Sequence, residues 1–391
     1  MAQSKLAADD TRWICELARA VGFELCGVTA AETFPELQRF PEWLVRGYAG
    51  EMKYLRDPRR LDPQSVMPNV RSLIVCALNY NSGLPYSTNA AAQQRDQKPR
   101  GWISRYAWGD DYHQVLWAKL NAIVEAMKQR FAARQPFEVR AYADTGPIHE
   151  RAAAKHAGLG WLGKNTLLIN QAAGSWLFLG TILTSLELTP SLGPDELPAP
   201  DRCGTCRACL DACPTAAIVE PYVLDANRCI SYLTIEFGGS IAEGLRQPMG
   251  GHVFGCDICQ DVCPWNRKSP RTAAAEFQPR NLAGGSRTPE KEDSLFLPDL
   301  LRLANLSEAQ FRESFRGSPV KRTKWRGLVR NACIALGNSA LEPGGSAYAE
   351  VRRTLQHLAQ CGEPVIAESA RWALSRIERT GNRAGAGLAE L

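Results

Sequence analysis

Residues 203–214 read C-G-T-C-R-A-C-L-D-A-C-P, and residues 256–264 read C-D-I-C-Q-D-V-C-P. In the first stretch three cysteines are separated by two residues each, and a fourth follows three residues later, directly before a proline. Three thiolates at this spacing fit three corners of one [4Fe–4S] cluster, while the cysteine before proline ligates a second cluster. The spacing therefore predicts a ferredoxin-like module that carries electrons one at a time.

The second stretch is one cysteine short of the first. Val253 stands where a complete motif would have its first cysteine, so the two stretches supply seven of the eight thiolates that two clusters need. Cys229, in N-R-C-I-S-Y-L between the stretches, is the nearest candidate for the eighth. By the crossed ligation of two-cluster ferredoxins, the expected ligands are Cys203, Cys206, Cys209 and Cys263 for one cluster, and Cys213, Cys229, Cys256 and Cys259 for the other.

A structural zinc site is the alternative, because paired C-x-x-C also suits tetrahedral zinc. Four zinc ligands would leave the three-cysteine run and the two Cys-Pro ends unexplained. The other five cysteines lie in apolar periodic segments and are expected to be ordinary buried thiols. They are Cys15, Cys26, Cys76, Cys333 and Cys361.

The cysteine-rich sequence shows no export signal at its start, which favours a reducing compartment, and we expect a cytoplasmic protein. The most apolar long stretch, 176–188, is too short to span a bilayer, so no membrane association is expected.

The hydrophobic pattern predicts an α+β chain of several domains. Up to about residue 190 it indicates an α/β domain, with expected helices at 11–21 and 112–131 and expected strands at 72–80, 137–142 and 175–186. A proline-rich stretch at 189–200 marks a boundary. The expected domains are 1–195, a ferredoxin-like domain at 196–270, and a linker with a helical domain at 271–391.

In the last of these domains, apolar residues recur at helical spacing from 297 to 379. We expect helices at 325–337, 347–360 and 364–379, an arrangement that resembles HEAT-type repeats.

Basic residues gather in one part of this helical domain. Between Phe311 and Arg330 there are seven Lys and Arg residues and one acid, Glu313, a local charge of +6 against +5 for the whole chain. Trp325 lies within this cluster. Basic side chains interleaved with an aromatic suit a nucleic acid, with phosphates to bind and a base to stack on. The alternative is a solvated helix face, which charge runs commonly are.

A module that carries single electrons implies an acceptor, and a flavin, a corrinoid or a partner protein would serve. No G-x-G-x-x-G follows a predicted strand, so a dinucleotide-binding fold is not supported. The sequence also lacks D-x-H-x-x-G, the histidine signature of many corrinoid proteins, and has five histidines in all. Residue patterns alone leave the acceptor open.

Several further motifs stand in a fixed order. They are R-L-D-P at 60–63, R-Y-A-W-G-D-D-Y-H at 105–113, A-D-T-G-P at 143–147, G-W-L-G-K-N at 160–165, a cluster block that ends C-P-W-N, and G-S-P-V-K-R-T-K-W-R-G at 317–327. With these motifs the chain resembles the epoxyqueuosine reductase family over nearly its whole length. The resemblance implies a cobalamin-binding first domain similar to that of reductive dehalogenases. It also implies reduction of epoxyqueuosine to queuosine at the wobble position of tRNA, with electrons from an external donor.

The resemblance also implies roles for individual residues. Asp144, in Y-A-D-T-G-P, is implied to be the general acid that protonates the departing oxygen. The alternative is that Asp144 caps its own turn, as aspartate commonly does. The candidate cofactor contacts are Arg60, Arg105, Tyr106, Lys164, Asn165, Gly255 and Asp257. The candidate tRNA contacts are Lys321, Arg322, Lys324, Trp325 and Arg326. His113 is expected to be a structural hydrogen-bonding residue.

Two rival functions remain at this point. One is a corrinoid reductive dehalogenase for small organohalides, for which an export signal and no basic helical tail would be expected. The other is a ferredoxin-type electron-transfer module for a partner protein, which would need no cofactor pocket.

Overall fold

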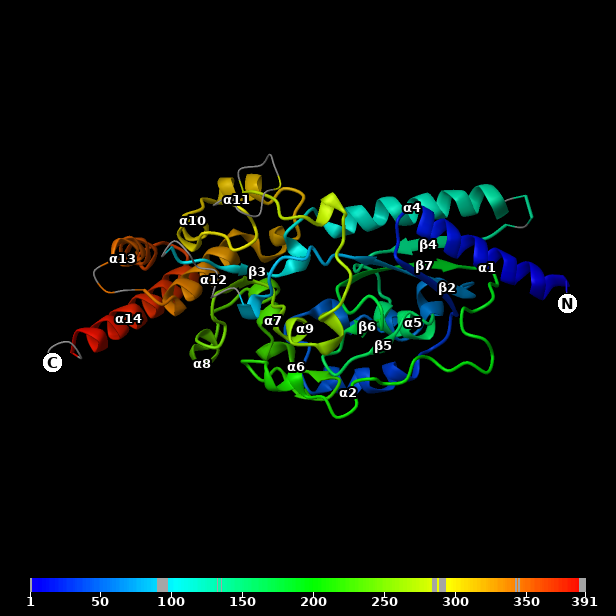
Figure 1. The fold of residues 1–391 in the computed structure, drawn as a ribbon, viewed down its shortest axis with the longest axis horizontal. Helices are drawn as coiled ribbons and strands as arrows, with labels where there is room; N and C mark the ends of the chain where they lie inside the picture. The colour runs from blue at the N-terminus through cyan, green and yellow to red at the C-terminus, as the bar shows by residue number, and fades with distance from the viewer. Residues whose placement is uncertain are drawn as a thin grey trace.

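The computed structural model describes residues 2–89, 98–131, 133–134, 136–282, 287, 293–341, 343 and 345–386. The molecule is elongated, with its N-terminal and C-terminal helices at opposite ends (Figure 1). No helix in this described part of the chain is both long and apolar enough to cross a membrane.

A four-stranded sheet forms the centre of the first region. Its order is β1 (Leu25–Ala30), β2 (Ser72–Asn79), β7 (Leu177–Thr184), β4 (Val139–Tyr142). Every neighbouring pair is antiparallel, so the predicted mixture of helix and sheet is confirmed but belongs to the α+β class and not to parallel α/β. The three predicted strands match β2, β4 and β7 to within two residues at each end.

Helices cover both faces of this sheet. Because successive side chains of a strand point to opposite faces, Ile74 and Cys76 of β2 join one core and Leu73 and Val75 join the other. The first core contains residues of α1 (Ala2–Ala20) and α4 (Tyr112–Phe131), which lie side by side in Figure 1. The second core contains the alanine face of α5 (Glu150–His156).

The cysteine-rich region is built from short elements. They are α6 (Ala208–Asp211), β8 (Ile218–Glu220), β9 (Val223–Leu224), α7 (Ile230–Ile235), α8 (Glu243–Arg246), β10 (His252–Phe254) and α9 (Ile258–Asp261). β10 pairs in parallel with β3 (Trp102–Ile103), so this region is joined to the first one through a shared sheet. The remaining short elements of the first region are α2 (Phe40–Val45), α3 (Pro63–Val66), β5 (Trp161–Leu162) and β6 (Leu168–Ile169).

The C-terminal region is helical, as predicted. Its helices are α10 (Leu300–Ala304), α11 (Glu308–Ser314), α12 (Lys324–Asn338), α13 (Ser346–Leu358) and α14 (Pro364–Ala386). Their organisation as HEAT repeats stays a prediction. The domain boundaries at 195 and 270 also stay predictions, because one hydrophobic core combines Trp102 and Trp108, Val253 and Phe254 with these helices.

α12 is fastened to the cysteine-rich region by a buried guanidinium group. Arg330 donates hydrogen bonds to the carbonyl oxygens of Leu233, Phe237 and Gly239 at 2.6–2.7 Å, and its side chain is fully buried. Arg330 therefore belongs to the interior, although the sequence pattern counted it in the basic cluster.

Candidate active site and cluster region

Several of the eight predicted cluster cysteines lie near enough to one another to influence each other's ionisation. Burial, and then the neighbouring thiols of Cys263 and Cys203, raise the pKa of Cys209 to about 11. Burial, and then Cys229, raise the pKa of Cys259 well above its ordinary value. Thiols close enough to disfavour each other's ionisation are a suitable donor set for a positively charged iron cluster, which binds them as thiolates.

Polar N–H groups also face these cysteines. The buried indole N–H of Trp161 has no hydrogen-bond partner among the described residues and lies beside Cys203. The backbone N–H of Ala217 donates to Cys213 Sγ at 3.3 Å. Such N–H groups stabilise cluster-bound thiolate sulfur. The residues present therefore fit the two clusters that the spacing predicts.

Two of the candidate cofactor contacts hold the cluster loops. Lys164 Nζ donates to the carbonyl oxygens of Gly204 and Cys206, the second at 3.0 Å. The Asn165 side chain is buried, and its amide donates to Cys259 O at 3.3 Å. In the structure these two residues position the loops that carry the cluster cysteines.

Two more of these candidates lie in the interior. Asp257 accepts hydrogen bonds from Trp102 Nε1 at 3.1 Å, from the Arg105 backbone at 2.7 Å and from Ser104 Oγ. The Arg105 guanidinium lies over the rings of Trp108 and Trp176, and it donates to two backbone carbonyls. Both side chains are 1% exposed. We therefore assign them a structural role, in which they hold neighbouring loops together, in place of the expected contact with a cofactor.

Asp144 follows β4 in a left-handed backbone conformation, with φ of +60°. A non-glycine residue in this region is strained and is found where the surrounding structure requires it. Its side chain is 62% exposed, and Asp144 Oδ2 accepts a hydrogen bond of 2.7 Å from Tyr112 and lies 3.4 Å from His113 Nε2. The contacts described for this carboxylate thus come from the first turn of α4 and not from its own turn.

A second carboxylate lies behind His113. Asp111 is buried, and its two oxygens lie 2.7 Å from His113 Nδ1 and 2.7 Å from Lys321 Nζ. Burial lowers the pKa of His113, but the hydrogen bonds with Asp111 and Asp144 outweigh it and raise the pKa to about 9. Desolvation by the surrounding protein acts to raise the pKa of Asp144 even though its side chain is accessible, but the hydrogen bonds from His113 and Tyr112 hold this pKa below its ordinary value.

Tyr106 links Asp144 to the second group of cysteines. Its ring lies edge-on to the Tyr112 ring, with centroids 5.9 Å apart. On its other side is Gly255, whose φ of +71° favours glycine and which directly precedes Cys256. A Cβ at position 255 would lie 3.6 Å from the Tyr106 ring. The predicted acid and a predicted cluster ligand are therefore connected through adjoining residues.

Another part of the site is formed where Tyr54 of the first region meets residues 321–326, called here the basic segment. Tyr54 is 46% exposed, and the guanidinium groups of Arg60 and Arg322 lie 5.7 and 5.9 Å from the centre of its ring. Arg322 forms a two-pronged ion pair with Glu236 at 2.8 and 2.9 Å. The charge of Asp144 acts on both Tyr54 and Arg322, so this group of residues lies near Asp144.

The basic segment itself is mostly at the surface. Lys321, Arg322, Lys324 and Arg326 are exposed. Trp325 is half-buried, and its indole N–H donates to Leu306 O at 2.6 Å, so its contacts are with the helical core. We therefore leave Trp325 out of the tRNA contacts proposed below.

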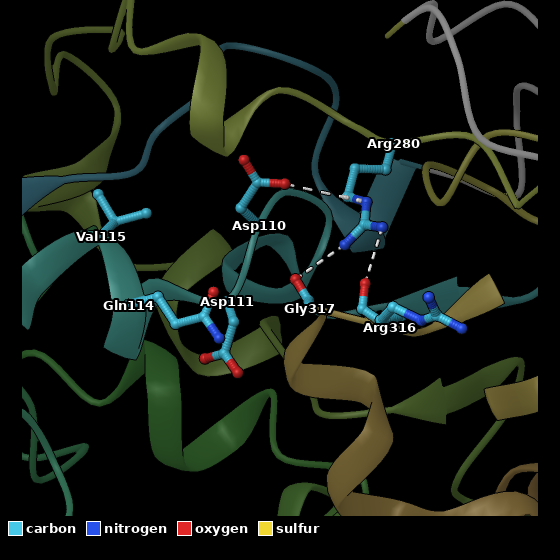
Figure 2. A pocket seen from close by; sticks show the side chains of 7 residues that line it. All are labelled: Asp110, Asp111, Gln114, Val115, Arg280, Arg316 and Gly317. Atoms are coloured by element: carbon cyan, nitrogen blue, oxygen red, sulfur yellow. Dashed lines mark hydrogen bonds and ion pairs between the residues drawn. The ribbon is translucent and has the colours of Figure 1, made fainter. Parts of the chain in front are cut away.

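A pocket of about 370 Å³ lies next to Asp111 (Figure 2). Asp110, Gln114 and Arg280 contribute to its wall, and Arg280 donates to Gly317 O at 2.8 Å. The pocket borders Asp111, whereas His113 is not among the residues that line it.

Comparisons with known proteins agree with this arrangement. Residues 60–145 match a family model described as "Epoxyqueuosine reductase QueG, DUF1730", and residues 202–266 match one described as "4Fe-4S double cluster binding domain". An epoxyqueuosine reductase from Xanthomonas campestris is 36% identical over 92% of this chain and 94% of its own. That from Escherichia coli is 37% identical over 96% of this chain and 91% of its own.

The chain belongs to the epoxyqueuosine reductase family. Among solved structures, an epoxyqueuosine reductase with an epoxyqueuosine-modified tRNA-Tyr stem loop is similar, with a TM-score of 0.78 and 31% identity. The match covers 94% of this chain and 90% of that one. As a member of this family the chain is an oxidoreductase, and the resemblance expected from its motifs is confirmed.

The sequence interpretation missed several residues of this family member's site. The sequence pattern does not single out Tyr112, Tyr54 or Glu236, and it assigns His113 only a structural role, although Tyr112 and His113 contact Asp144 and the other two contact Arg322. Tyr112 and His113 do stand within the quoted motif R-Y-A-W-G-D-D-Y-H, which was the available signal for them.

Proposed function

We propose that this chain reduces the epoxide of epoxyqueuosine in tRNA to the alkene of queuosine. Removal of the epoxide oxygen breaks two C–O bonds, consumes two electrons and two protons, and releases water. The observation that carries the proposal is the exposed carboxylate of Asp144, held by Tyr112 and His113 beside the residues that lead to Cys256. A proton donor and an electron path thus meet at one site.

Two [4Fe–4S] clusters on the eight cysteines would deliver the electrons singly, from an external one-electron donor. The family further implies cobalamin, which supplies when bound a reduced cobalt centre able to react with carbon. Arg60, Tyr106 and Gly255 remain the proposed contacts. Their guanidinium, phenol and open backbone suit the amide and phosphate groups at the edge of a corrin.

Asp144 would act by protonating the departing oxygen. A carboxyl group within reach of the C–O bond lowers the barrier to its cleavage. One solved relative, from Bacillus subtilis, is described with its catalytic aspartate loop swung out of the active site. Asp144 likewise lies in a loop, between β4 and α5.

The tRNA would be held by Lys321, Arg322, Lys324 and Arg326, which are exposed and of which Arg322 lies near enough to Asp144 for its charge to act on the guanidinium. Binding through phosphates provides affinity, whereas selection of the modified base requires that base to leave the stack and enter the site. The relative solved with an epoxyqueuosine-modified tRNA stem loop supports tRNA as the substrate.

The test is anaerobic incubation of the purified protein with a strong one-electron reductant, cobalamin and tRNA that carries epoxyqueuosine. After digestion, mass spectrometry should show loss of one oxygen mass from the nucleoside, and only when cobalamin is present. Conversion without cobalamin would contradict the cofactor assignment, and no conversion with intact clusters would contradict the proposed reaction.

A further inference from the structure

The reaction proposed above needs more protons than Asp144 can carry. Both protons end on the same oxygen, the first when the ring opens and the second when the oxygen leaves as water. One carboxyl group supplies one proton at a time, so the Asp144 carboxylate must be reprotonated within each turnover. The group that protonates Asp144 has to lie within hydrogen-bonding distance of its carboxylate.

The surroundings of Asp144 favour its ionised form. Tyr112 donates to Oδ2 at 2.7 Å, and the backbone N–H of Asp144 donates to Glu150 at 3.2 Å, which fixes the loop. Hydrogen bonds to a carboxylate stabilise its charged state. In the resting site Asp144 therefore holds a negative charge, and a neighbour has to provide the proton that it donates.

His113 has the geometry of that neighbour. Its Nε2 lies 3.4 Å from Asp144 Oδ2, while its Nδ1 lies 2.7 Å from the buried carboxylate of Asp111. A ring between two carboxylates is stabilised as the imidazolium, with one N–H directed at each. The ring is 23% exposed, so solvent can restore its proton after transfer.

Asp111 fixes the orientation of this ring, and Lys321 fixes Asp111. Lys321 Nζ lies 2.7 Å from Asp111 Oδ2, across the interface between the basic segment and α4. The arrangement is of the kind in which a buried carboxylate holds the tautomer and orientation of a catalytic imidazole. Lys321 is thus engaged in the site as well as being near the proposed tRNA surface.

The other charged and titratable groups around Asp144 suit this task less well. Burial, followed by the charge of Asp144, raises the pKa of Tyr112 far above its ordinary value, so this hydroxyl retains its proton. Burial, and then the charge of Asp144, raise the pKa of Glu150 to about 8, but the contact described for its carboxyl group is with the Asp144 backbone N–H and not with the Asp144 carboxylate. Arg151, also on α5, donates to Thr166 O. Tyr106, Arg60, Arg322 and Glu236 also face this site, and Arg322 is paired with Glu236.

We propose that His113 is the proton store of the site: its imidazolium transfers the Nε2 proton to the Asp144 carboxylate, Asp144 passes this proton to the substrate oxygen, and solvent then reprotonates the ring, so that a second passage by the same route supplies the second proton. Asp111 and Lys321 are positioning residues for His113. The transfer moves one proton and no electrons, since the electrons arrive separately from the one-electron donor through the clusters. This inference rests on the proposed function.

The kinetic test compares His113→Gln with His156→Gln. His156 is a matched control, because its Nε2 lies 3.0 Å from Glu36 in a comparable ion pair on α5. With saturating tRNA, the wild-type single-turnover rate should decline above a pH of about 9, where the ring loses its proton. His113→Gln should be slower by about 10²-fold at pH 7 and should lack this decline.

Added imidazole should restore part of the His113→Gln rate, whereas tRNA affinity and cluster content should match the wild type. A small acid can replace a missing proton donor but does not repair a misplaced loop. The inference is overturned if His113→Gln keeps the wild-type rate and pH profile, or if it is slow and imidazole has no effect. His156→Gln should behave as the wild type.

A titration separates failure of this inference from failure of the proposed function. With five histidines in the chain, the His113 signal can be assigned in histidine-labelled protein by comparison with His113→Gln. Its pKa should lie near 9 and should fall in Asp111→Asn. A titration near the unperturbed value of about 6.5 overturns the inference whether or not the protein converts epoxyqueuosine. No conversion by the wild type, with the His113 pKa near 9, overturns the proposed function instead.

Discussion

The Tyr112 hydroxyl donates a hydrogen bond of 2.7 Å to Asp144 Oδ2, which joins the start of α4 to the loop after β4. The Tyr112 ring is itself held by Phe178, with the two rings stacked at 4.5 Å and 4° from parallel. This places a fixed donor against an exposed carboxylate in a strained backbone conformation. The position of the acid is therefore determined by packing of α4 on the sheet.

Tyr112→Phe should slow the reaction without unfolding the protein. The substitution removes a hydrogen bond to a charged group, worth about 1.5–3 kcal/mol, but leaves the stacking on Phe178 in place. We expect a decrease in single-turnover rate of about tenfold or more and little change in melting temperature. A wild-type rate in this variant would show that the hydroxyl does not position Asp144.

Trp161→Phe should change the reduction potential of one cluster. It removes the buried N–H beside Cys203 while retaining an aromatic ring in the core. Loss of an N–H donor to sulfur destabilises the more negatively charged reduced cluster, so its potential should become more negative. An anaerobic redox titration followed by electron paramagnetic resonance should show this shift in one cluster only. A shift in both clusters, or in neither, would contradict the assignment of Trp161 to the Cys203 cluster.

Charge reversal in the basic segment should weaken tRNA binding in a salt-dependent way. Lys324→Glu with Arg326→Glu should raise Kd by about tenfold or more, and reduce the slope of log K against log salt by about one to two. The matched control is Arg312→Glu with Arg316→Glu, since these residues are exposed but pair with Glu308 and Glu313 of α11. Equal losses in both double variants would show general electrostatic attraction instead of a defined contact surface.

Arg330→Met should destabilise the fold. It leaves the carbonyl oxygens of Leu233, Phe237 and Gly239 without their donor in the interior. We expect a loss of about 3–5 kcal/mol in the free energy of unfolding, measured by chemical denaturation. Arg326→Met, at an exposed position on the same helix, should change it by about 0.5 kcal/mol or less. Similar effects of the two substitutions on the free energy of unfolding would contradict stabilisation of the fold by the buried hydrogen bonds of Arg330.

Local patterns in the sequence predicted the features that depend on local physics. Cysteine spacing is determined by how a short loop wraps a cluster, so it predicted the double-cluster domain that residues 202–266 match, while the ligand set of each cluster stays a prediction. The helical periodicity of 112–131 coincides with the bounds of α4. Strand β1 was missed, since its six residues are interrupted by Gly27, which is needed because the backbone of Ala157 passes close by.

Features that depend on tertiary packing were not predictable in this way. Tyr112 and Asp144 are 32 residues apart, and Asp111 and Lys321 are 210 apart, so their contacts exist only in the folded chain. Arg105 and Asp257 carry charges that usually indicate surface or ligand contacts, yet both are enclosed and form internal hydrogen bonds, with Arg105 Nε alone left without a partner among the described residues. The order of residue types along the chain does not show which charged side chains are paired in the protein interior.

The most direct test of the account is the conversion of epoxyqueuosine in tRNA by the wild type, Asp144→Asn and Asp110→Asn under single-turnover conditions, followed by mass spectrometry. Asp110 is a suitable control because it pairs with Arg287 at the edge of the neighbouring pocket. We predict loss of one oxygen mass with the wild type and Asp110→Asn at similar rates, and a decrease of about 10²–10⁴-fold for Asp144→Asn. Conversion by Asp144→Asn at the wild-type rate would contradict the assignment of Asp144 as the acid.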